Sequence, residues 1–306
     1  MWSYTLRRLL VTIPTLLAVI TVCYILVHAA PGGPFDNEKQ VSEAVLANLN
    51  AKYHLDQPAW KQYLFYLNNL LHGDLGASFR YADWSVNDLV AAALPVSLSI
   101  GGLSLFISFI LGVGMGIAAA LKQNSIADYS VMLVGNLGSV FPSFVIGPVL
   151  VLVFALWLRW LPAGGWDDFK PAYMLMPVAL LTFINVATIA RVMRGSMLEV
   201  LHSNFIRTAR AKGLPTRIVV LRHAIKPALL PVVSVMGPLA ISSITAALVT
   251  ETVFSLPGLG RLIVNGAGNR DYTLVLGLVV LITVLAVTLN LIVDLVYAAL
   301  DPKIRY

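Results

Sequence analysis

The strongest concentration of charge lies in residues 207–231, whose sequence is RTARAKGLPTRIVVLRHAIKPALLP. This stretch holds six Lys or Arg side chains and one His around a Gly-Leu-Pro turn, although 58% of the whole chain is hydrophobic. Clustered cations bind phosphate groups or acidic protein surfaces. Two roles therefore stay open for the stretch: contact with lipid headgroups, or contact with another protein.

Groups that carry out catalysis are sparse. The five His lack the His-Glu-x-x-His spacing of zinc hydrolases. No Gly is followed by Lys, so the chain has no phosphate-binding loop of the G-x-x-x-x-G-K-[ST] type. The single cysteine, Cys23, has no partner within the chain for a disulfide. We expect no catalytic residue, no metal site and no cofactor held by this chain.

The elements around the basic stretch are apolar. Only 12% of residues are charged and the mean hydropathy is +0.82, whereas about a quarter of residues are charged in soluble domains. Crossing a bilayer takes about 20 apolar residues. Six runs meet that length, which predicts an all-α polytopic membrane protein with six transmembrane helices, at residues 9–29, 95–121, 131–158, 173–192, 228–250 and 273–299.

The first run has an alternative interpretation as a signal peptide. Arg7 and Arg8 precede it, and Val27-His28-Ala29 ends it with small residues. Its apolar part is about 19 residues long, which exceeds the usual core of a signal peptide. The length favours a retained first helix.

Lys and Arg are distributed unequally between the two sides of the six runs. Residues 1–8, 122–130, 193–226 and 300–306, together with Arg191, hold 13 Lys or Arg and three acids, whereas the opposite segments hold 8 and 11. Cytoplasmic loops carry the excess of Lys and Arg. Both termini are therefore predicted to be cytoplasmic, and the net charge of +6 reflects topology and not nucleic-acid binding.

Two segments are longer than a connection requires. The first, 31–93, is predicted outside, with a helix-like stretch at 41–71; a docking platform for an external partner and a structural lid both stay open. The second, 193–226, reads as a helical extension, a short helix at 205–212 and a further helix. Ser203 or Asn204 suits its N-cap and Gly213 its C′ position, because Gly adopts the left-handed backbone found there.

The second segment resembles a known motif. Arg207-Thr208-Ala209 stands where the EAA loop of permease subunits of ATP-driven (ABC) importers has E-A-A, Gly213 supplies its glycine, and Leu230-Pro231 closes it. The glutamate is missing, a departure usual in the peptide and nickel branch of that family. Residues 251–276 and the C-terminal YAALDPKIRY resemble the same branch.

The resemblance implies the type I ABC importer permease fold in a bacterial inner membrane. It divides the chain into a first helix at 1–30, the extracytoplasmic segment 31–93, the permease domain 94–293, and residues 294–306, which form the end of the last helix and the cytoplasmic tail. It also implies a coupling helix seated in a groove of an ATPase, formed by Asn204, Phe205, Ile206, Arg207, Thr208, Ala209, Arg210, Ala211, Lys212, Gly213 and Leu214. The small Ala209 and Ala211 would let that partner approach closely.

Partners follow from the same resemblance. We expect two peripheral ATPase subunits that bind the ATP and Mg, a second homologous permease forming a heterodimer, an extracytoplasmic peptide-binding protein, and membrane lipid. An outer gate or binding-protein contact is expected at Glu251, Pro257, Gly258 and Gly260. For Glu251 an ion pair at a helix end is the favoured alternative.

An ion-coupled secondary transporter is the alternative function. That class needs several acids or basic partners inside the membrane. Asp294 alone lies well within a predicted span, where a structural partner is favoured over an ion site. Gly112 and Gly116 form a G-x-x-x-G pattern, which predicts close packing between helices.

Overall fold

The computed structural model describes residues 2–29, 56–81 and 84–300. Within them the only β pairing is an isolated bridge between Ala77 and Ser85, so the predicted all-α class is confirmed. Two of the helices, η1 and η2, are π-helices. In chain order the elements are α1 (Trp2–Ala29), α3 (Ala59–Leu71), α4 (Val86–Leu121), α5 (Ile126–Val140), α6 (Ser143–Leu150), η1 (Val151–Trp157), α7 (Pro171–Leu201), α8 (Asn204–Ala211), α9 (Thr216–Ile218), η2 (Val219–Ala224), α10 (Ile225–Val253), α11 (Leu259–Gly268) and α12 (Tyr272–Leu300).

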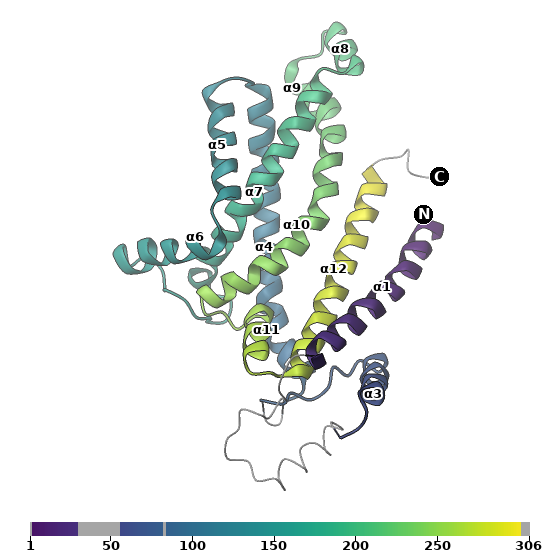
Figure 1. Cartoon of the computed structure of the whole chain (residues 1–306). Coiled ribbons are helices and arrows are strands. Elements are labelled where there is room, and N and C mark those ends of the chain that lie inside the picture. The colour runs from purple at the N-terminus through teal and green to yellow at the C-terminus, as the bar shows by residue number, and fades with distance from the viewer. Residues whose placement is uncertain (1, 30–55, 82–83, 301–306) are drawn as a thin grey trace.

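The long helices run back and forth between two ends of the molecule. Four stretches are long and apolar enough to cross a membrane: Val86–Leu121, Pro171–Leu201, Thr216–Val253 and Tyr272–Tyr297. Figure 1 places α8 and α9 at one end and α3 and α11 at the other, while α1 begins and α12 ends on the side of α8. The predicted grouping of the basic segments on one side agrees with this arrangement.

The predicted span 131–158 is wrong as a single helix. The chain breaks between α5 and α6, and the two halves are bent by 101°. Phe141 and Pro142 at the break both have extended backbones, because a residue before proline is pushed out of the helical region. Counting the bent pair as one span gives up to five, and α1 adds a shorter apolar helix, Ile13–Ala29, so six spans stay a prediction.

The central helix pair, α4 and α7, packs at glycines. A Cβ atom at Gly112 would lie 2.7 Å from the Ile189 side chain, and one at Gly116 would lie 2.6 Å from Met193. These glycines therefore let two helices approach closely, which confirms the prediction made for the G-x-x-x-G pattern. A Cβ at Gly114, between them, would meet nothing within 4 Å.

An ion pair joins α5 to α7 near the α8 end. Arg194 Nε and Nη2 donate to the two carboxylate oxygens of Asp128 at 2.5 and 2.7 Å. Asp128 is buried and also accepts from the Asn124 amide at 2.9 Å. Because the bidentate geometry fixes both side chains, α5 is tied to the helix that leads into α8.

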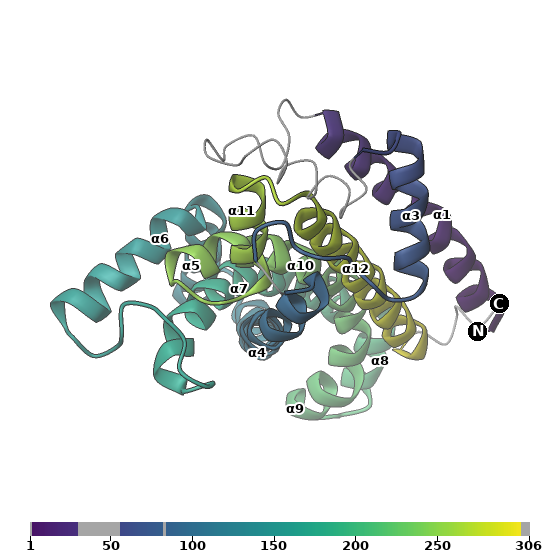
Figure 2. The ribbon, with the colours of Figure 1, turned by 90° about the horizontal axis from the view of Figure 1, so that it is seen from below.

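At the opposite end, α3 lies against α1 (Figure 2). The Tyr63 hydroxyl and the Thr21 hydroxyl are 2.6 Å apart, and the Tyr24 hydroxyl donates to the Ala59 carbonyl at 3.1 Å. Of the predicted helix 41–71, the part from Ala59 onward is confirmed, while residues up to 55 lie outside the described ones.

Candidate coupling helix and outer turn

The short helix α8 ends as the sequence predicts. Gly213 has a φ of +79° at the C′ position. Its amide donates to the Arg210 carbonyl at 2.9 Å, and the Leu214 amide donates to the Ala209 carbonyl at 3.4 Å. This pair of bonds is the Schellman arrangement, so glycine supplies the left-handed residue that turns the chain sharply back.

The start of α8 differs in detail from the prediction. Ser203 occupies the N-cap position, but its hydroxyl donates to the Val200 carbonyl at 2.6 Å and does not cap the helix. The bond is possible because α7 ends only two residues earlier. The side chain therefore tightens the corner between α7 and α8.

Two residues of α8 pack against other elements of the same chain. Ile206 is fully buried and Ala209 is 7% exposed, within a cluster shared with Met193 and Met197 of α7 and Val219 of η2. Ala209 was expected to let a partner approach closely, and that expectation is wrong because its side chain faces this cluster. The apolar spacing of Ile206 and Ala209 was the signal for an anchored face.

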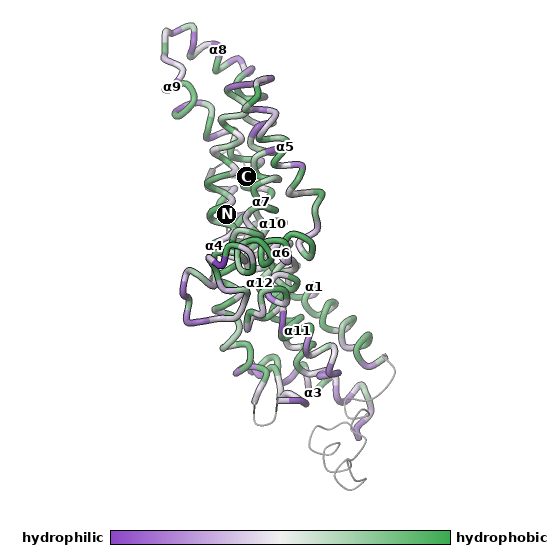
Figure 3. Tube along the Cα trace, turned by 90° about the vertical axis from the view of Figure 1, so that its left-hand side faces the viewer, coloured by the Kyte–Doolittle hydropathy of each residue, from purple (hydrophilic) through white to green (hydrophobic). Residues whose placement is uncertain are grey.

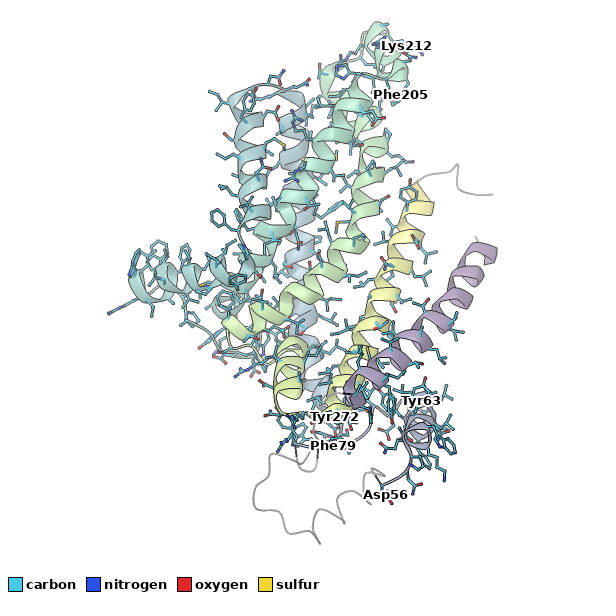
Figure 4. All side chains as sticks on the ribbon, in the orientation of Figure 1. Asp56, Tyr63, Phe79, Phe205, Lys212 and Tyr272 are labelled. Carbon is cyan, nitrogen blue, oxygen red and sulfur yellow. The ribbon has the colours of Figure 1, made fainter. Side chains whose placement is uncertain are left out.

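The remaining surface of α8 is open and positive. Phe205 is 50% exposed, and Figure 4 shows it with Lys212 at the tip of the molecule. Figure 3 shows this tip as one of the hydrophilic regions of the trace, in contrast to the apolar helices below it. No acid lies between Asn204 and Leu214. Such a face suits an acidic groove, and it is formed by Asn204, Phe205, Arg207, Thr208, Arg210, Ala211 and Lys212.

The outer turn is organised by Glu251 in the last turn of α10. Its side chain is fully buried. Oε1 accepts from the Ser97 hydroxyl of α4 at 2.5 Å, and Oε2 accepts from the amides of Gly260 at 2.7 Å and Arg261 at 3.3 Å. Those amides belong to the first turn of α11, where they lack partners within the helix and where negative charge is favoured. One carboxylate thus ties three helices together.

The predicted ion pair for Glu251 is wrong, because its partners here are neutral donors. Gly258 and Gly260 are buried around the carboxylate, and a Cβ at Gly260 would lie 2.5 Å from the Leu248 backbone. Pro257 is exposed. Of the four predicted outer residues, only Pro257 can therefore touch a binding protein without rearrangement.

Two further polar residues at this end, Ser97 and Asp271, were not predicted as site residues. The Ser97 hydroxyl accepts from the Leu259 amide at 2.9 Å while it donates to Glu251. Buried Asp271 accepts from the Ser78 hydroxyl at 2.5 Å and from the Leu274 amide at 3.2 Å. An Asp immediately before an apolar run is a helix-start signal that would have found Asp271.

A cavity of about 150 Å³ lies beneath the outer turn, between α4, α10, α11 and α12. Its walls are mostly apolar, with Ser97, Ser243 and Glu251 among the polar residues. Ser243 also accepts from Asn185 of α7 at 2.9 Å. Asp294 lies outside this cavity and is half-buried on α12. The polar groups that line the cavity are thus held mainly by bonds within the chain.

Known proteins with similar sequences match this chain along its whole length. The oligopeptide transport system permease protein OppB of Escherichia coli K12 is 54% identical over 306 residues, which is 100% of both chains. The dipeptide transport system permease protein DppB of Bacillus subtilis is 38% identical and covers 100% of this chain and 98% of its own. The motifs quoted above favour the oligopeptide B permease within the family, and that prediction is confirmed.

Solved structures support the fold. The MetNI methionine ABC transporter, in an inward-facing conformation, has a chain with a TM-score of 0.60 and 17% identity that covers 70% of this chain and 96% of its own. An amino acid ABC transporter with histidines gives a TM-score of 0.54. The predicted type I ABC importer permease fold is therefore confirmed.

The profile of one protein family matches residues 112–306, which include α8 and the outer turn. Its description is the inner membrane component of binding-protein-dependent transport systems. Together with the full-length relatives, the match means that this chain belongs to the family of inner-membrane components of binding-protein-dependent transport systems.

Proposed function

We propose that this chain is the permease subunit of an ATP-driven importer that moves oligopeptides across the bacterial inner membrane. ATP is hydrolysed on separate subunits, because the chain has no phosphate-binding loop of its own. The observation that carries the proposal is α8, with Ile206 and Ala209 fastened inward and Phe205 and Lys212 presented outward. A helix held in this way can be pushed by a partner and pass the movement to α7 and α10.

The arrangement of partners is part of the proposal. The exposed cations of α8 dock an ATPase, which binds the ATP and Mg. A second, similar permease completes the pathway and engages a second ATPase. A peptide-binding protein delivers substrate at the end that holds Pro257, and lipid surrounds the long helices.

The hydrogen-bond partners of the buried acids do not favour an ion-coupled transporter. Glu251 and Asp271 have their carboxylates satisfied by hydroxyl and amide donors. Asp128 is satisfied by Arg194. Among the described residues no group of three or more His, Cys, Asp or Glu can hold a metal ion. These acids therefore stabilise helix ends, and their placement does not indicate an ion path.

Cysteine crosslinking tests the coupling role. The background is Cys23→Ser, which removes the only native thiol. Thr208→Cys and Ala211→Cys place thiols on the exposed face of α8, and Ala209→Cys is the matched buried control. We expect the exposed positions to crosslink to an ATPase subunit in native membranes, with a yield that changes on addition of ATP and vanadate, and the buried one to stay unlinked.

Two results would overturn the proposal. If the ATPases co-purify and no exposed α8 position crosslinks, the coupling assignment is wrong and the basic segment is a lipid anchor. If membrane vesicles containing the complex and a binding protein take up no oligopeptide on addition of ATP, the substrate assignment is wrong.

A further inference from the structure

A second cavity lies at the end opposite α8, where the N-terminal helices meet α12. Its volume is about 350 Å³, which is within the range of small-ligand pockets. Tyr24 and His28 come from the outer end of α1, Tyr66 from α3, Asp74 from the following segment and Tyr272 from the start of α12. The cavity is therefore shared by the N-terminal part of the chain and the permease core. Figure 4 shows Tyr272 and Phe79 at this end of the molecule.

The walls carry rings and a single charge. Tyr24 and His28 are stacked with centroids 3.9 Å apart, and the His28 ring lies 5.8 Å from that of Tyr272. Asp74 is the only acid among the described lining residues, which include no Lys or Arg. Aromatic faces and a carboxylate attract cations. The remaining ring-bearing lining residues are Phe65, Tyr66 and Phe79.

Two polar groups have capacity left for a ligand. The Tyr66 hydroxyl oxygen is buried and has no hydrogen-bond partner among the residues that the structure describes. Burial raises the pKa of that hydroxyl above its usual range, so it stays protonated. Its oxygen is closed off from solvent, so a ligand in the cavity can donate to it only after a shift of the Tyr66 side chain. Asp74 uses Oδ1 to accept from the Gly76 amide at 2.8 Å. Its second oxygen can accept from a ligand.

A buried hydroxyl without a partner is costly and rare in folded proteins. A ligand that donates a hydrogen bond would satisfy the hydroxyl oxygen and remove part of that cost. A ligand whose only charge is a phosphate or a carboxylate does not fit, since Asp74 would repel it and the described walls hold no Lys or Arg. A compact cation with several N–H donors fits both the rings and the two acceptors.

We propose that this cavity binds a primary ammonium group. Two sources could supply one: the amino terminus of an incoming peptide, and the headgroup of an ethanolamine phospholipid. The peptide source rests on the proposed function, whereas the lipid source does not.

Asp74→Asn is the decisive variant. The amide oxygen of Asn still accepts from Gly76, so the turn is kept and only the charge is removed. Tyr66→Phe removes only the unpartnered hydroxyl, and we expect it to leave stability unchanged or slightly raised without ligand. Asp56→Asn is the matched control, because Asp56 is an exposed acid that does not line the cavity.

Binding is measured on the assembled permease–ATPase complex in lipid nanodiscs, without the soluble binding protein. The peptide arm uses trialanine and N-acetyl-trialanine in phosphatidylglycerol nanodiscs, with calorimetry. We expect only the free amine to bind and Asp74→Asn to weaken it by about tenfold, as for loss of a charge-assisted hydrogen bond. The lipid arm counts, by native mass spectrometry, the phosphatidylethanolamine molecules that stay bound to the complex. We expect the wild type to retain this lipid and Asp74→Asn to lose it.

Either arm, with Asp56→Asn behaving as the wild type, supports the ammonium site and identifies its source. The proposal is overturned if N-acetyl-trialanine binds as well as trialanine and phosphatidylethanolamine retention is the same in wild type and Asp74→Asn. If the complex takes up no oligopeptide but still retains phosphatidylethanolamine, the proposed function is wrong and the ammonium site is supported.

Discussion

The two ends of the molecule each contain a short helix after a sharp turn, and they are stabilised in opposite ways. At one end α8 is held by apolar contacts of Ile206 and Ala209, while its charged side chains stay exposed. At the other end the first turn of α11 is held by the buried carboxylate of Glu251. A buried polar network fixes one geometry, because any displacement leaves donors unsatisfied. Apolar contacts with an exposed charged face suit a surface on which a partner acts.

The glycines show the same difference. Gly213 at the α8 turn has a φ of +79° and open space around it, so its role is backbone conformation. Gly260 at the outer turn has no positive φ, but a Cβ there would meet backbone at 2.5 Å, so its role is close packing. Substitutions at the two ends should therefore differ in size and in cause.

The largest effect is expected for Glu251→Ala. The change removes the acceptor of the Ser97 hydroxyl, the buried Gly260 amide and the partly buried Arg261 amide. A buried donor that loses its acceptor costs about 1–3 kcal/mol, and three donors are affected here. We expect a fall of that order in the free energy of unfolding, measured by chemical unfolding in detergent micelles.

Glu251→Gln is the control for shape. It keeps one acceptor oxygen and the side-chain volume, so we expect it to lose less stability than Glu251→Ala. Equal stability of Glu251→Ala and the wild type would show that the outer turn does not depend on this carboxylate.

Gly260→Ala is expected to come second. The added methyl group meets the Leu248 backbone and the Glu251 carboxylate, and overpacking of a tight site costs about 1–3 kcal/mol. The same unfolding measurement applies, with Gly114→Ala as control because its Cβ would meet nothing within 4 Å. If both variants unfold at the same denaturant concentration, close packing at Gly260 does not contribute to the free energy of unfolding.

Gly213→Ala should have a smaller effect, confined to the α8 end. A side chain in the left-handed region costs about 1 kcal/mol, and no atom within 4 Å adds a clash. We expect faster amide hydrogen exchange in α8 with little change elsewhere. The α8 amides should exchange more slowly in Gly213→Asn than in Gly213→Ala, since Asn tolerates this backbone better. The reverse order would contradict a conformational role for Gly213.

The sequence predicted those features that depend on local rules. Gly213 follows a short polar helix, and Gly112 and Gly116 have the spacing of a packed helix pair, so both predictions are confirmed. Hydropathy located the long helices, but it also joined α5 to α6, because a window average does not register the backbone break at Pro142.

Tertiary contacts account for what the sequence did not predict. Glu251 takes its hydroxyl donor from Ser97, 154 positions away, and no local pattern identifies that partner. Ala209 looked available to a partner because it is small, and only the packing of η2 against α8 shows that it is buried.

Phe205→Ala should have the smallest effect on stability and a large one on coupling. Phe205 is 50% exposed, and substitutions at exposed positions change stability by no more than about 0.5 kcal/mol. A buried aromatic anchor at an interface is worth about 2 kcal/mol, or roughly 30-fold in affinity. We expect Phe205→Ala to unfold at the same denaturant concentration as the wild type, but to retain less ATPase on purification and to take up less peptide. Leu221→Ala is the matched control, because Leu221 is an apolar residue on η2 with a similar exposed fraction of 57%. If Phe205→Ala and Leu221→Ala retain the ATPase equally, the exposed face of α8 is not where the partner binds, and the contrast between the two ends loses its functional meaning.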